Sequence, residues 1–354
     1  MERLAIWWNV QRLLRPNGKP LARALNATEA DGWTTATLAE KIERCAAVLR
    51  ALSADRRPAL VGLCEVADDD LAARLAKASK LGLEVVRDAA SHLEGADLVL
   101  LIDPDTFDVA APPVSHNIHN RFTTRDIYEV ELRTKDGFPL VVIACHWPSR
   151  RISNSEPLRI AAADWSRRLV EKHLKFPVGS VINANGRARM PGRTKLVERA
   201  STPVLFLGDF NDSPFDVSLD QVFGCLRDPS RVLGSLTMPR GRDRDAADAY
   251  LAKRIRLLNP SWPLLVGTPP GSTYWESEWW LLDQVTCSPG LLTGSGIRWV
   301  DGSLKLHALR TVDVGGTAVP WCSRSDIPAP YDPKTHRGIS DHLPLTFTLE
   351  IPEA

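Results

Sequence analysis

Short apolar runs, each the length of one buried strand, recur along the chain and constrain its fold more than any other feature. Branched and aromatic side chains dominate these runs, which favours strands over helical segments of similar length. They cover residues 4–8, 59–64, 98–102, 140–145, 204–207 and 345–351. Residues 127–132 alternate apolar and polar side chains, the pattern of a strand that is half exposed. Such a chain must bury several strands in one or more sheets.

Segments with apolar side chains at helical spacing lie between these runs. Thr37 and Glu40 have the spacing of a capping box, and apolar residues follow at helical intervals as far as Leu52. Asp69 is expected to cap a second helix that ends at Gly82. Residues 159–173 have the pattern of a third helix. Helices and strands are therefore expected to alternate along much of the chain.

The connection between residues 127–132 and 140–145 distinguishes a parallel from a mixed sheet. Lys135, Asp136 and Gly137 form a hairpin turn signal, which implies that the two strands pair antiparallel. In a doubly wound sheet, neighbouring strands are parallel and are joined by crossover connections, not by hairpins. The predicted fold class is therefore α+β or mixed α/β.

The composition indicates a globular protein that can bury a full core. Of the 354 residues, 44% are hydrophobic and 25% are charged, and no internal repeat or low-complexity linker interrupts them. We therefore expect one domain over residues 1–354. The net charge of +1 provides no global field to hold nucleic acid or a membrane, so any basic recognition surface must be local.

The cysteines and the N-terminal segment indicate the cellular compartment in which the protein is expected. The six cysteines show neither a CxxC pair nor a short disulfide spacing, and we expect buried, reduced thiols. The first residues lack the pattern of a signal peptide, and no window approaches the roughly 20 apolar residues of a membrane span. A cytoplasmic protein without a membrane segment is the expectation.

Polar side chains follow the apolar runs at the point where each run ends. Asn9, Glu65 and His146 each come directly after a predicted strand, and Asp209 and Asn211 follow the run at 204–207. Two further positions belong to the same pattern: Asp283 follows an apolar stretch, and Asp341 with His342 precedes the last strand. Any one of these residues has a plain explanation as a turn former. A purely structural explanation for the whole set is much weaker.

These side chains share a chemistry. Carboxylate and amide oxygens from Asn9, Glu65, Asp209, Asn211 and Asp341 are hard ligands that suit Mg²⁺ or Mn²⁺ rather than Zn²⁺. The two histidines supply an acid and a base, as hydrolysis of a phosphate ester requires, and a carboxylate such as that of Asp283 would orient one imidazole. The pattern predicts metal-assisted hydrolysis.

Other motifs are weaker or absent. Pro214 stands where an EF-hand loop beginning at Asp209 would need glycine, so calcium binding of that kind is rejected. The sequence lacks the GxSxG, GxxxxGK[ST] and GxGxxG fingerprints. His116 and His119 have a spacing that permits metal binding, but no carboxylate or cysteine pattern supports it, and we expect a surface loop there.

The motifs together resemble those of the endonuclease/exonuclease/phosphatase superfamily, which has the DNase I-like fold. They are WNV at 8–10, CEV at 64–66, HWPSR at 146–150, GDFNDSP at 208–214, LDQV at 282–285 and SDH at 340–342. The similarity runs from residue 4 to residue 349 and is greatest to bacterial members of unassigned substrate. It implies a four-layer α/β/β/α sandwich, in which helices flank two packed mixed β-sheets and the active site lies at one end.

The resemblance also implies a role for each site residue. Glu65 corresponds to the main metal ligand, assisted by Asn9 and Asp341. Asp209 and Asn211 correspond to the pair that handles the attacking water and the scissile phosphate.

The two histidines correspond to the proton-transferring groups. His342 matches the residue that activates water in partnership with Asp209 or Asp283. His146 matches the residue that protonates the leaving oxygen or stabilises charge. Members of the superfamily differ over which group is the base and whether one or two metal ions act, so both questions stay open here.

Four residues are candidates for substrate binding. Arg125 resembles a phosphate-contacting arginine of some members, and Ser149 and Arg150 adjoin His146. A guanidinium can bind two phosphate oxygens at once. Trp275 belongs to an aromatic segment that is able to stack on a base, although packing explains it equally well. Basic stretches at 187–199 and 240–256 are candidates for following a nucleic-acid backbone or for an ordinary solvated surface.

Differences from particular subfamilies of the superfamily argue against some classes of substrate. Gln11 and His146 stand where abasic-site endonucleases carry Asp and Tyr, and the segment around Asp283 lacks the signature of inositol polyphosphate phosphatases. Sphingomyelinases share the histidine pair but are usually secreted. The sequence therefore predicts a Mg²⁺- or Mn²⁺-dependent phosphodiesterase, with a nuclease acting on DNA or RNA favoured. The alternatives are an enzyme for a small or lipid-linked phosphate and a catalytically silent binding module.

Overall fold

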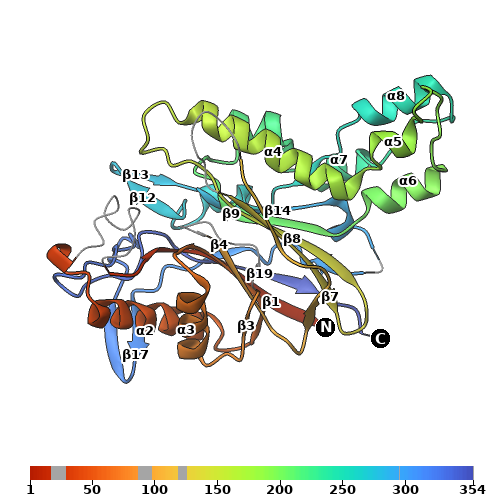
Figure 1. The fold of residues 1–354 in the computed structure, drawn as a ribbon. Helices are drawn as coiled ribbons and strands as arrows, with labels where there is room; N and C mark the ends of the chain where they lie inside the picture. The colour runs from red at the N-terminus through yellow and green to blue at the C-terminus, as the bar shows by residue number, and fades with distance from the viewer. Residues whose placement is uncertain (17–28, 87–97, 119–125, 295, 354) are drawn as a thin grey trace.

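The computed structural model describes residues 1–16, 29–86, 98–118, 126–294 and 296–353, and two β-sheets form its centre (Figure 1). The strands of the first sheet are, in order, β15 (Arg298–Trp299), β19 (Leu345–Glu350), β1 (Glu2–Leu13), β2 (Pro58–Val66), β4 (Leu98–Ile102) and β3 (Glu84–Val86), and β16 (Lys305–Leu306) also pairs with β19. The strands of the second are β10 (Cys225–Leu226), β11 (Leu257–Leu258), β14 (Asp283–Cys287), β9 (Val204–Asp209), β8 (Pro139–His146), β7 (Ile127–Thr134) and β5 (Phe107–Val109), and β6 (Val114–His116) also pairs with β7.

Helices and two small hairpins complete the described structure. The hairpins are β12 (Thr273–Trp275) with β13 (Glu278–Trp280) and β17 (Thr311–Val314) with β18 (Thr317–Pro320). The helices are α2 (Thr35–Leu52), α3 (Asp69–Ser79), α4 (Glu156–Leu174), α5 (Val178–Val181), α6 (Arg193–Ala200), α7 (Pro229–Gly234) and α8 (Arg244–Ala252). Short 3-10 turns cover Glu29–Asp31, Trp262–Val266 and Pro289–Leu291, and a π-helical turn covers Ser218–Phe223.

The alternation of side chains along β1 explains the layers. Trp7 points into the apolar core between the two sheets, where it packs with residues of β2, β9 and β19. Its neighbours Ile6 and Trp8 point to the opposite face and pack under α2 and α3. Because successive side chains of a strand face opposite sides, one strand contributes to two cores. A third apolar cluster lies between the second sheet and α4, α6 and α8 (Figure 1). The four-layer α/β/β/α sandwich is confirmed.

The predicted strands are confirmed at all seven apolar segments, with extensions of a few residues. The hairpin prediction is also confirmed, because β7 and β8 pair antiparallel around Gly137, which has a φ of 90°. The sheets are mixed, since β1 pairs parallel with β2, and β8 pairs parallel with β9.

Both predicted helix caps are displaced along the chain. Thr34 caps α2, and its side chain accepts a hydrogen bond from the backbone N–H of Thr37, so Thr37 is the third helical residue rather than the cap. Asp68, not Asp69, caps α3 through the N–H of Leu71. Consecutive Thr or Asp residues all satisfy the capping preference, so the sequence did not distinguish them.

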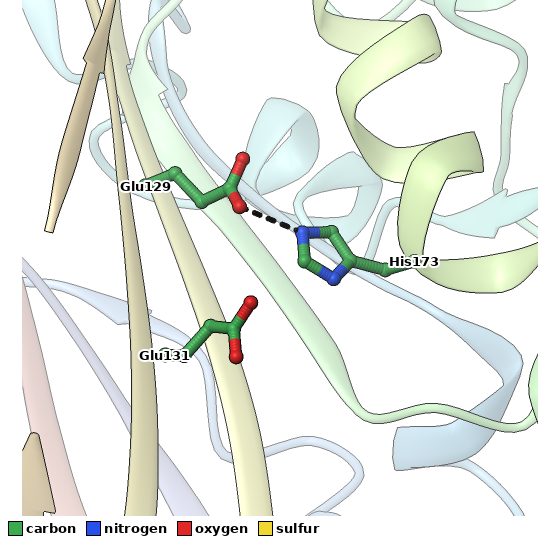
Figure 2. Close-up of side chains that lie close together, drawn as sticks. All are labelled: Glu129, Glu131 and His173. Atoms are coloured by element: carbon green, nitrogen blue, oxygen red, sulfur yellow. Dashed lines mark hydrogen bonds and ion pairs between the residues drawn. The ribbon is translucent and has the colours of Figure 1, made fainter. Parts of the chain in front are cut away.

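Two further expectations were wrong, and both concern the outer face of β7. Glu129 was expected on the solvent side of a half-exposed strand, but its side chain is only 3% exposed. His116 was expected on a surface loop, whereas it ends β6 and its Nε2 lies 2.9 Å from Oε2 of Glu129. Lys172 and His173, near the C-terminal end of α4, contact the buried Glu129 carboxylate, and Figure 2 shows His173 beside it. His119 lies outside the described residues.

The described structure also bears on the cysteines, on membrane-spanning helices and on the two basic stretches. All six cysteines are buried and none forms a disulfide. Among the described residues, no helix is long and apolar enough to cross a membrane. The basic stretches at 187–199 and 240–256 include α6 and α8, which Figure 1 shows at the end of the molecule away from β12 and β13.

Candidate active site

The polar residues that follow the predicted strands meet at one end of the sandwich. Asn9 pairs with Cys64, next to Glu65, in the parallel register of β1 and β2. His146 pairs with Asp209 in the parallel register of β8 and β9. Because parallel strands end at the same edge of a sheet, the register places these side chains together. The predicted convergence of Asn9, Glu65, His146 and Asp209 is thus observed.

Asp283 reaches the same edge by a different route from the one expected. It begins β14 instead of following a strand, and it lies opposite Asp209 in an antiparallel pairing with β9. In an antiparallel pair, the start of one strand lies beside the end of the other. The prediction of its location holds, but the predicted strand end was wrong, because Trp279 and Trp280 belong to the separate hairpin strand β13.

Asn9 bridges two carboxylates. Its Nδ2 donates to Oε1 of Glu65 at 3.2 Å and to Oδ2 of Asp209 at 3.0 Å. Its Oδ1 accepts the backbone N–H of Gln11 at 2.9 Å, which orients the amide. Asn9 is 1% exposed, so the surrounding buried residues restrict the movement of its side chain. Two like-charged carboxylates therefore face a common space with one neutral amide between them.

The backbone around Glu65 is in an uncommon conformation. Gln11, Arg12 and Glu65 have φ values of 53°, 52° and 63°, in the left-handed region that residues other than glycine rarely adopt. The irregular register of β1 and β2 after Asn9 accompanies these values. It allows the backbone N–H of Arg12 to donate to Oε2 of Glu65 at 2.8 Å. The chain thus holds Glu65 by its backbone, and such conformations are frequent at functional sites.

Asp209 and Asn211 form a tight turn after β9. The N–H of Asn211 donates to Oδ1 of Asp209 at 2.9 Å, and its Nδ2 donates to the carbonyl of Trp147 at 2.9 Å. Gly208 precedes this turn because a Cβ there would lie 2.3 Å from Sγ of Cys145. The absent side chain lets β9 approach β8 closely and brings Asp209 beside His146.

His342 and Asp283 form a buried pair. Nδ1 of His342 lies 2.6 Å from Oδ2 of Asp283, whose Oδ1 accepts the indole N–H of Trp7 at 2.9 Å. Burial lowers the pKa of His342, but the carboxylates, Asp283 foremost, outweigh burial and raise the pKa to about 10. Nε2 of His342 faces Oδ2 of Asp209 at 3.9 Å. The imidazole is thus oriented by one carboxylate toward another.

His146 lies on the other side of Asp209. Its Nε2 is 3.7 Å from Oδ2 of Asp209 and 4.0 Å from Oε1 of Glu65. The side chain is 2% exposed. Two imidazoles, those of His146 and His342, therefore flank the carboxylate of Asp209.

The segment before β19 completes the site. Ser340 accepts the N–H of His342 and donates its hydroxyl to the carbonyl of Asn9 at 2.8 Å, which ties this segment to β1. The carbonyl of Asp341 accepts the hydroxyl of Thr273 in β12. The Asp341 carboxylate is turned toward the opening, where Arg151 approaches it at 3.5 Å.

The four candidate substrate-binding residues are placed differently. Ser149, Arg150 and Trp275 line the cavity described below, whereas Arg125 lies outside the described residues. The Arg150 guanidinium is paired with the carboxylates of Asp212 and Asp216 and lies 4.5 Å from the ring centre of Trp280. These two carboxylates therefore largely neutralise the charge of Arg150.

Sequence reasoning missed Arg151 as a site residue. Its side chain is 55% exposed, lines the cavity and lies 5.9 Å from the ring centre of Trp275. Its position directly after the motif that contains His146 and Arg150 was the available signal. Adjacent arginines look equivalent in sequence. Both line the cavity, and only the structure shows that Arg150 is paired with Asp212 and Asp216 whereas Arg151 is the more exposed of the two.

Most of these side chains line one cavity of about 260 Å³. Its lining includes the acidic and histidine side chains of Glu65, His146, Asp209, Asp341 and His342, together with Arg151, Ile152 and Trp275. This volume is near the lower end of the range for small-molecule sites. The enclosed part is therefore suited to one phosphate group and what is directly attached to it.

Comparisons with known proteins show the family and the fold of the chain. The family model described as "Endonuclease/Exonuclease/phosphatase family" matches residues 7–238, more than half of the chain. The chain belongs to this family. Endonuclease/exonuclease/phosphatase proteins are phosphoric ester hydrolases, which is the chemistry that the carboxylates and histidines around the cavity suit. No curated protein matches the sequence significantly.

Solved structures share the fold at low sequence identity. A D. rerio TDP2 structure, complexed with a single-strand DNA product, is 14% identical, covers 99% of each chain and has a TM-score of 0.54. A mannosyl-6-phosphatase of Bacteroides thetaiotaomicron is 13% identical, with 99% of this chain and 100% of that chain covered and a TM-score of 0.52. These likenesses establish a common architecture along the whole chain.

The side chains at the base of the cavity fit a divalent cation. Glu65 and Asp209 present carboxylates to one space, and the Asn9 amide lies between them. Asp209, Asp283 and His342 also place potential ligand atoms within 4.8 Å of one another. Because His342 and Asp283 are hydrogen-bonded to each other, this second group has the character of a proton-transfer pair. A cation near Glu65 would relieve the repulsion between the carboxylates.

Proposed function

We propose that this protein is a divalent-metal-dependent phosphodiesterase, most simply a nuclease that hydrolyses DNA or RNA. The observation that carries the proposal is the position of Asp209. Its carboxylate lies between the imidazoles of His146 and His342, and it shares Asn9 with Glu65. Charged oxygens for a cation and two groups able to move protons are thus within one small cavity.

The proposed metal ligands are Glu65, Asn9 and Asp341, and the proposed ion is Mg²⁺ or Mn²⁺. These hard cations prefer the oxygen donors that the three residues offer. When bound, the ion would supply positive charge to the phosphate oxygens and increase the acidity of a coordinated water. The backbone N–H of Arg12 holds the Glu65 carboxylate in place without adding a charge.

The proton-transfer roles follow from the hydrogen bonds. Asp283 holds the Nδ1 side of His342, so its Nε2 faces the cavity and Asp209. The carboxylates keep this imidazole protonated near neutral pH, and the positive charge of a bound cation would lower its raised pKa toward the range in which Nε2 accepts a proton from the attacking water. Asp209 and Asn211 position that water and the scissile phosphate. His146 would stabilise the phosphate oxygen or protonate the leaving oxygen, since its Nε2 faces the same space.

The mouth of the cavity supports a nuclease. Trp275 offers a flat apolar face and Arg151 places a cation beside it. A base can stack on such a face while the adjoining phosphate meets the guanidinium. Ser149 would contact the same phosphate, and Arg125 is retained as a candidate for that role. The proposal treats residues 1–354 as one domain that acts in the cytoplasm.

One observation favours a second candidate. The enclosed volume is small, and the basic stretches that include α6 and α8 lie at the other end of the molecule (Figure 1). A phosphatase or phosphodiesterase for a small-molecule or lipid-linked phosphate would need neither a long groove nor a basic track. The two candidates use the same catalytic residues and differ in the group attached to the phosphate.

A metal-dependent activity screen distinguishes the candidates. The wild type and Asp209→Ala are assayed with Mg²⁺ or Mn²⁺ on plasmid DNA, single-stranded DNA, RNA, bis-p-nitrophenyl phosphate and p-nitrophenyl phosphate. Asp136→Ala is the matched control, because Asp136 is exposed in the turn between β7 and β8.

Degradation of a nucleic acid that is lost in Asp209→Ala and kept in Asp136→Ala supports the nuclease. Cleavage of only the small esters supports the second candidate. Absence of turnover, with phosphate-ligand binding retained and the ligand unchanged under saturating Mn²⁺, would contradict both and leave a silent binding module.

A further inference from the structure

A second group of metal-ligating side chains lies outside the cavity, on the outer face of the second sheet. Glu129 and Glu131 are two residues apart in β7 and therefore point to the same face. His173 comes from the C-terminal turn of α4 above them, as Figure 2 shows. His116 comes from β6, the edge strand that pairs with β7. Glu129, Glu131 and His173 thus lie together, and His116 adjoins the group through Glu129.

The carboxylate of Glu129 is the centre of this group. Nε2 of His116 lies 2.9 Å from its Oε2, and Nε2 of His173 lies 3.0 Å from its Oε1. Ligand atoms of Glu129, Glu131 and His173 all lie within 4.8 Å of one another. Glu129 is 3% exposed and the His173 side chain 7%, so the group is shielded from bulk water on the helix side.

This group is separate from the active site. Glu129 pairs with Ile143 in β8, three residues before His146. Ile143 belongs to the apolar cluster under α4, whereas Ala144, with the opposite orientation, belongs to the core between the sheets. Glu129 therefore lies on the face of the sheet that α4 covers. None of the four residues is among those that line the cavity.

We propose that His116, Glu129, Glu131 and His173 form a site for a divalent transition metal ion, with Zn²⁺ as the best match. Two imidazole nitrogens and two carboxylates are a donor set that Zn²⁺ accepts in four-coordinate sites. Mg²⁺ and Ca²⁺ prefer oxygen ligands and would not select the histidines. The site joins the edge strand β6 and the end of α4 to β7, so its role is structural.

Two contacts of Glu129 are close to the spacing of ligands in a bound state. Ligand atoms of a tetrahedral Zn²⁺ site lie roughly 3.3 Å apart, given metal–ligand distances of about 2.0–2.1 Å. The two contacts between imidazole nitrogen and carboxylate oxygen are 2.9 and 3.0 Å. These two contacts need to lengthen by about 0.3–0.4 Å, while the ligand atoms of Glu131 and His116 close in around the ion. Each imidazole must bind the ion through a deprotonated Nε2: a neutral imidazole keeps its proton on Nδ1, and an imidazolium releases its Nε2 proton to solvent.

Lys172 is the competitor for this site. Its ammonium lies 3.2 Å from Oε1 of Glu129, and the side chain is 57% exposed. It is free to swing into solvent when a metal ion arrives, but its charge opposes the ion. Removing it should therefore strengthen metal binding, an effect that a group held together only by ion pairs would not show.

The test is calorimetric titration of the full-length protein with Zn²⁺, starting from metal-free protein. The wild type should bind one equivalent that remains in Glu65→Gln and disappears in the double variant His116→Gln/His173→Gln. His307→Gln is the matched control, since His307 is partly buried but bonds the hydroxyl of Thr346 rather than a carboxylate. Zn²⁺ should also raise the Tm of Glu65→Gln, but not that of the triple variant Glu65→Gln/His116→Gln/His173→Gln, in which both sites are altered.

Lys172→Ala should bind Zn²⁺ up to about fivefold more tightly, the range expected for removing one exposed ion pair. This variant and Glu131→Gln change exposed side chains, so they test the proposal even where the double variant fails to fold. Glu131→Gln should weaken binding. The proposal is overturned where the wild type binds no Zn²⁺ beyond the equivalent that Glu65→Gln removes, or where neither exposed variant alters the affinity.

Discussion

Lys41 is a buried cation beneath the active site, and its titration should be visible in the stability of the protein. It lies on α2, is 1% exposed, and its Nζ donates to the carbonyl of Ile339 at 2.8 Å. The Tyr331 ring centre is 5.3 Å away. Burial lowers the pKa of Lys41 to about 8, although nearby groups that include Asp341 and Glu65 oppose this change.

The sign and size of the effect follow from the two pKa values. The unfolded chain keeps this proton until about pH 10.5, whereas the folded protein loses it near pH 8. Between these values the unfolded state binds more protons, so the free energy of unfolding rises with pH. The contribution is complete above pH 10.5 and is lost as the pH falls toward 8. A difference of 2.5 units, 10.5 minus 8, corresponds to about 3 kcal/mol at about 1.4 kcal/mol per unit.

Lys41→Met removes the titrating group at similar length. Urea unfolding of the wild type and the variant is measured at several values from pH 7 to pH 10.5, with circular dichroism as the signal. The stability of the wild type relative to Lys41→Met should increase by about 3 kcal/mol across this range. Comparing the two proteins cancels the other lysines, tyrosines and cysteines that titrate in the same window.

Lys195→Met is the control, because Lys195 is exposed on α6 and its removal should leave the pH profile unchanged. If the curves of the wild type and Lys41→Met stay parallel within about 1 kcal/mol, the ammonium is not held in a low-dielectric site and the reasoning from burial is wrong.

Four further predictions concern the site and its support. Glu65→Gln should keep the fold and weaken the dependence of activity on Mg²⁺ or Mn²⁺, and an unchanged metal titration would contradict its role as a ligand. Treatment with EDTA should abolish hydrolysis and added Mg²⁺ or Mn²⁺ should restore it; full activity in EDTA would exclude a metal-dependent step. His146→Ala and His342→Ala should each lower kcat by at least ~10²-fold with a smaller change in KM, as expected for proton transfer, whereas an effect on KM alone would indicate a substrate contact. Asp212→Asn should lower the free energy of unfolding by about 3–5 kcal/mol, because it breaks the buried ion pair with Arg159 at 2.7 Å; a loss below about 1 kcal/mol in urea unfolding would show that the pair is not needed.

The strands and the position of the active site could be predicted from local patterns. A strand buried on both faces needs a continuous apolar run, so the run itself marks the strand. A polar residue directly after such a run lies at an edge of the sheet whatever the rest of the chain does. Asn9, Glu65, His146 and Asp209 were found for this reason, and family motifs agreed with them.

Contacts between distant segments could not be predicted in this way. The pair of Asp283 and His342 joins residues 59 apart, and the bond from Asn9 to Asp209 joins residues 200 apart. Periodicity within a window of sequence carries no information about such pairs. The start of β14 reaches the site only because that strand is antiparallel to β9.

The sequence by itself determined the alternation of apolar strands, the mixed sheets implied by the hairpin, and the residues at the strand ends, since each depends on neighbours along the chain. Tertiary structure alone decided which of the two arginines at the cavity is neutralised by carboxylates and that Glu129 is buried between two histidines. Arg150 is neutralised by Asp212 and Asp216, and α4 covers the face of β7 that a sequence pattern assigned to solvent. Burial and charge pairing depend on elements that meet only after folding, and for that reason these features are invisible in the sequence.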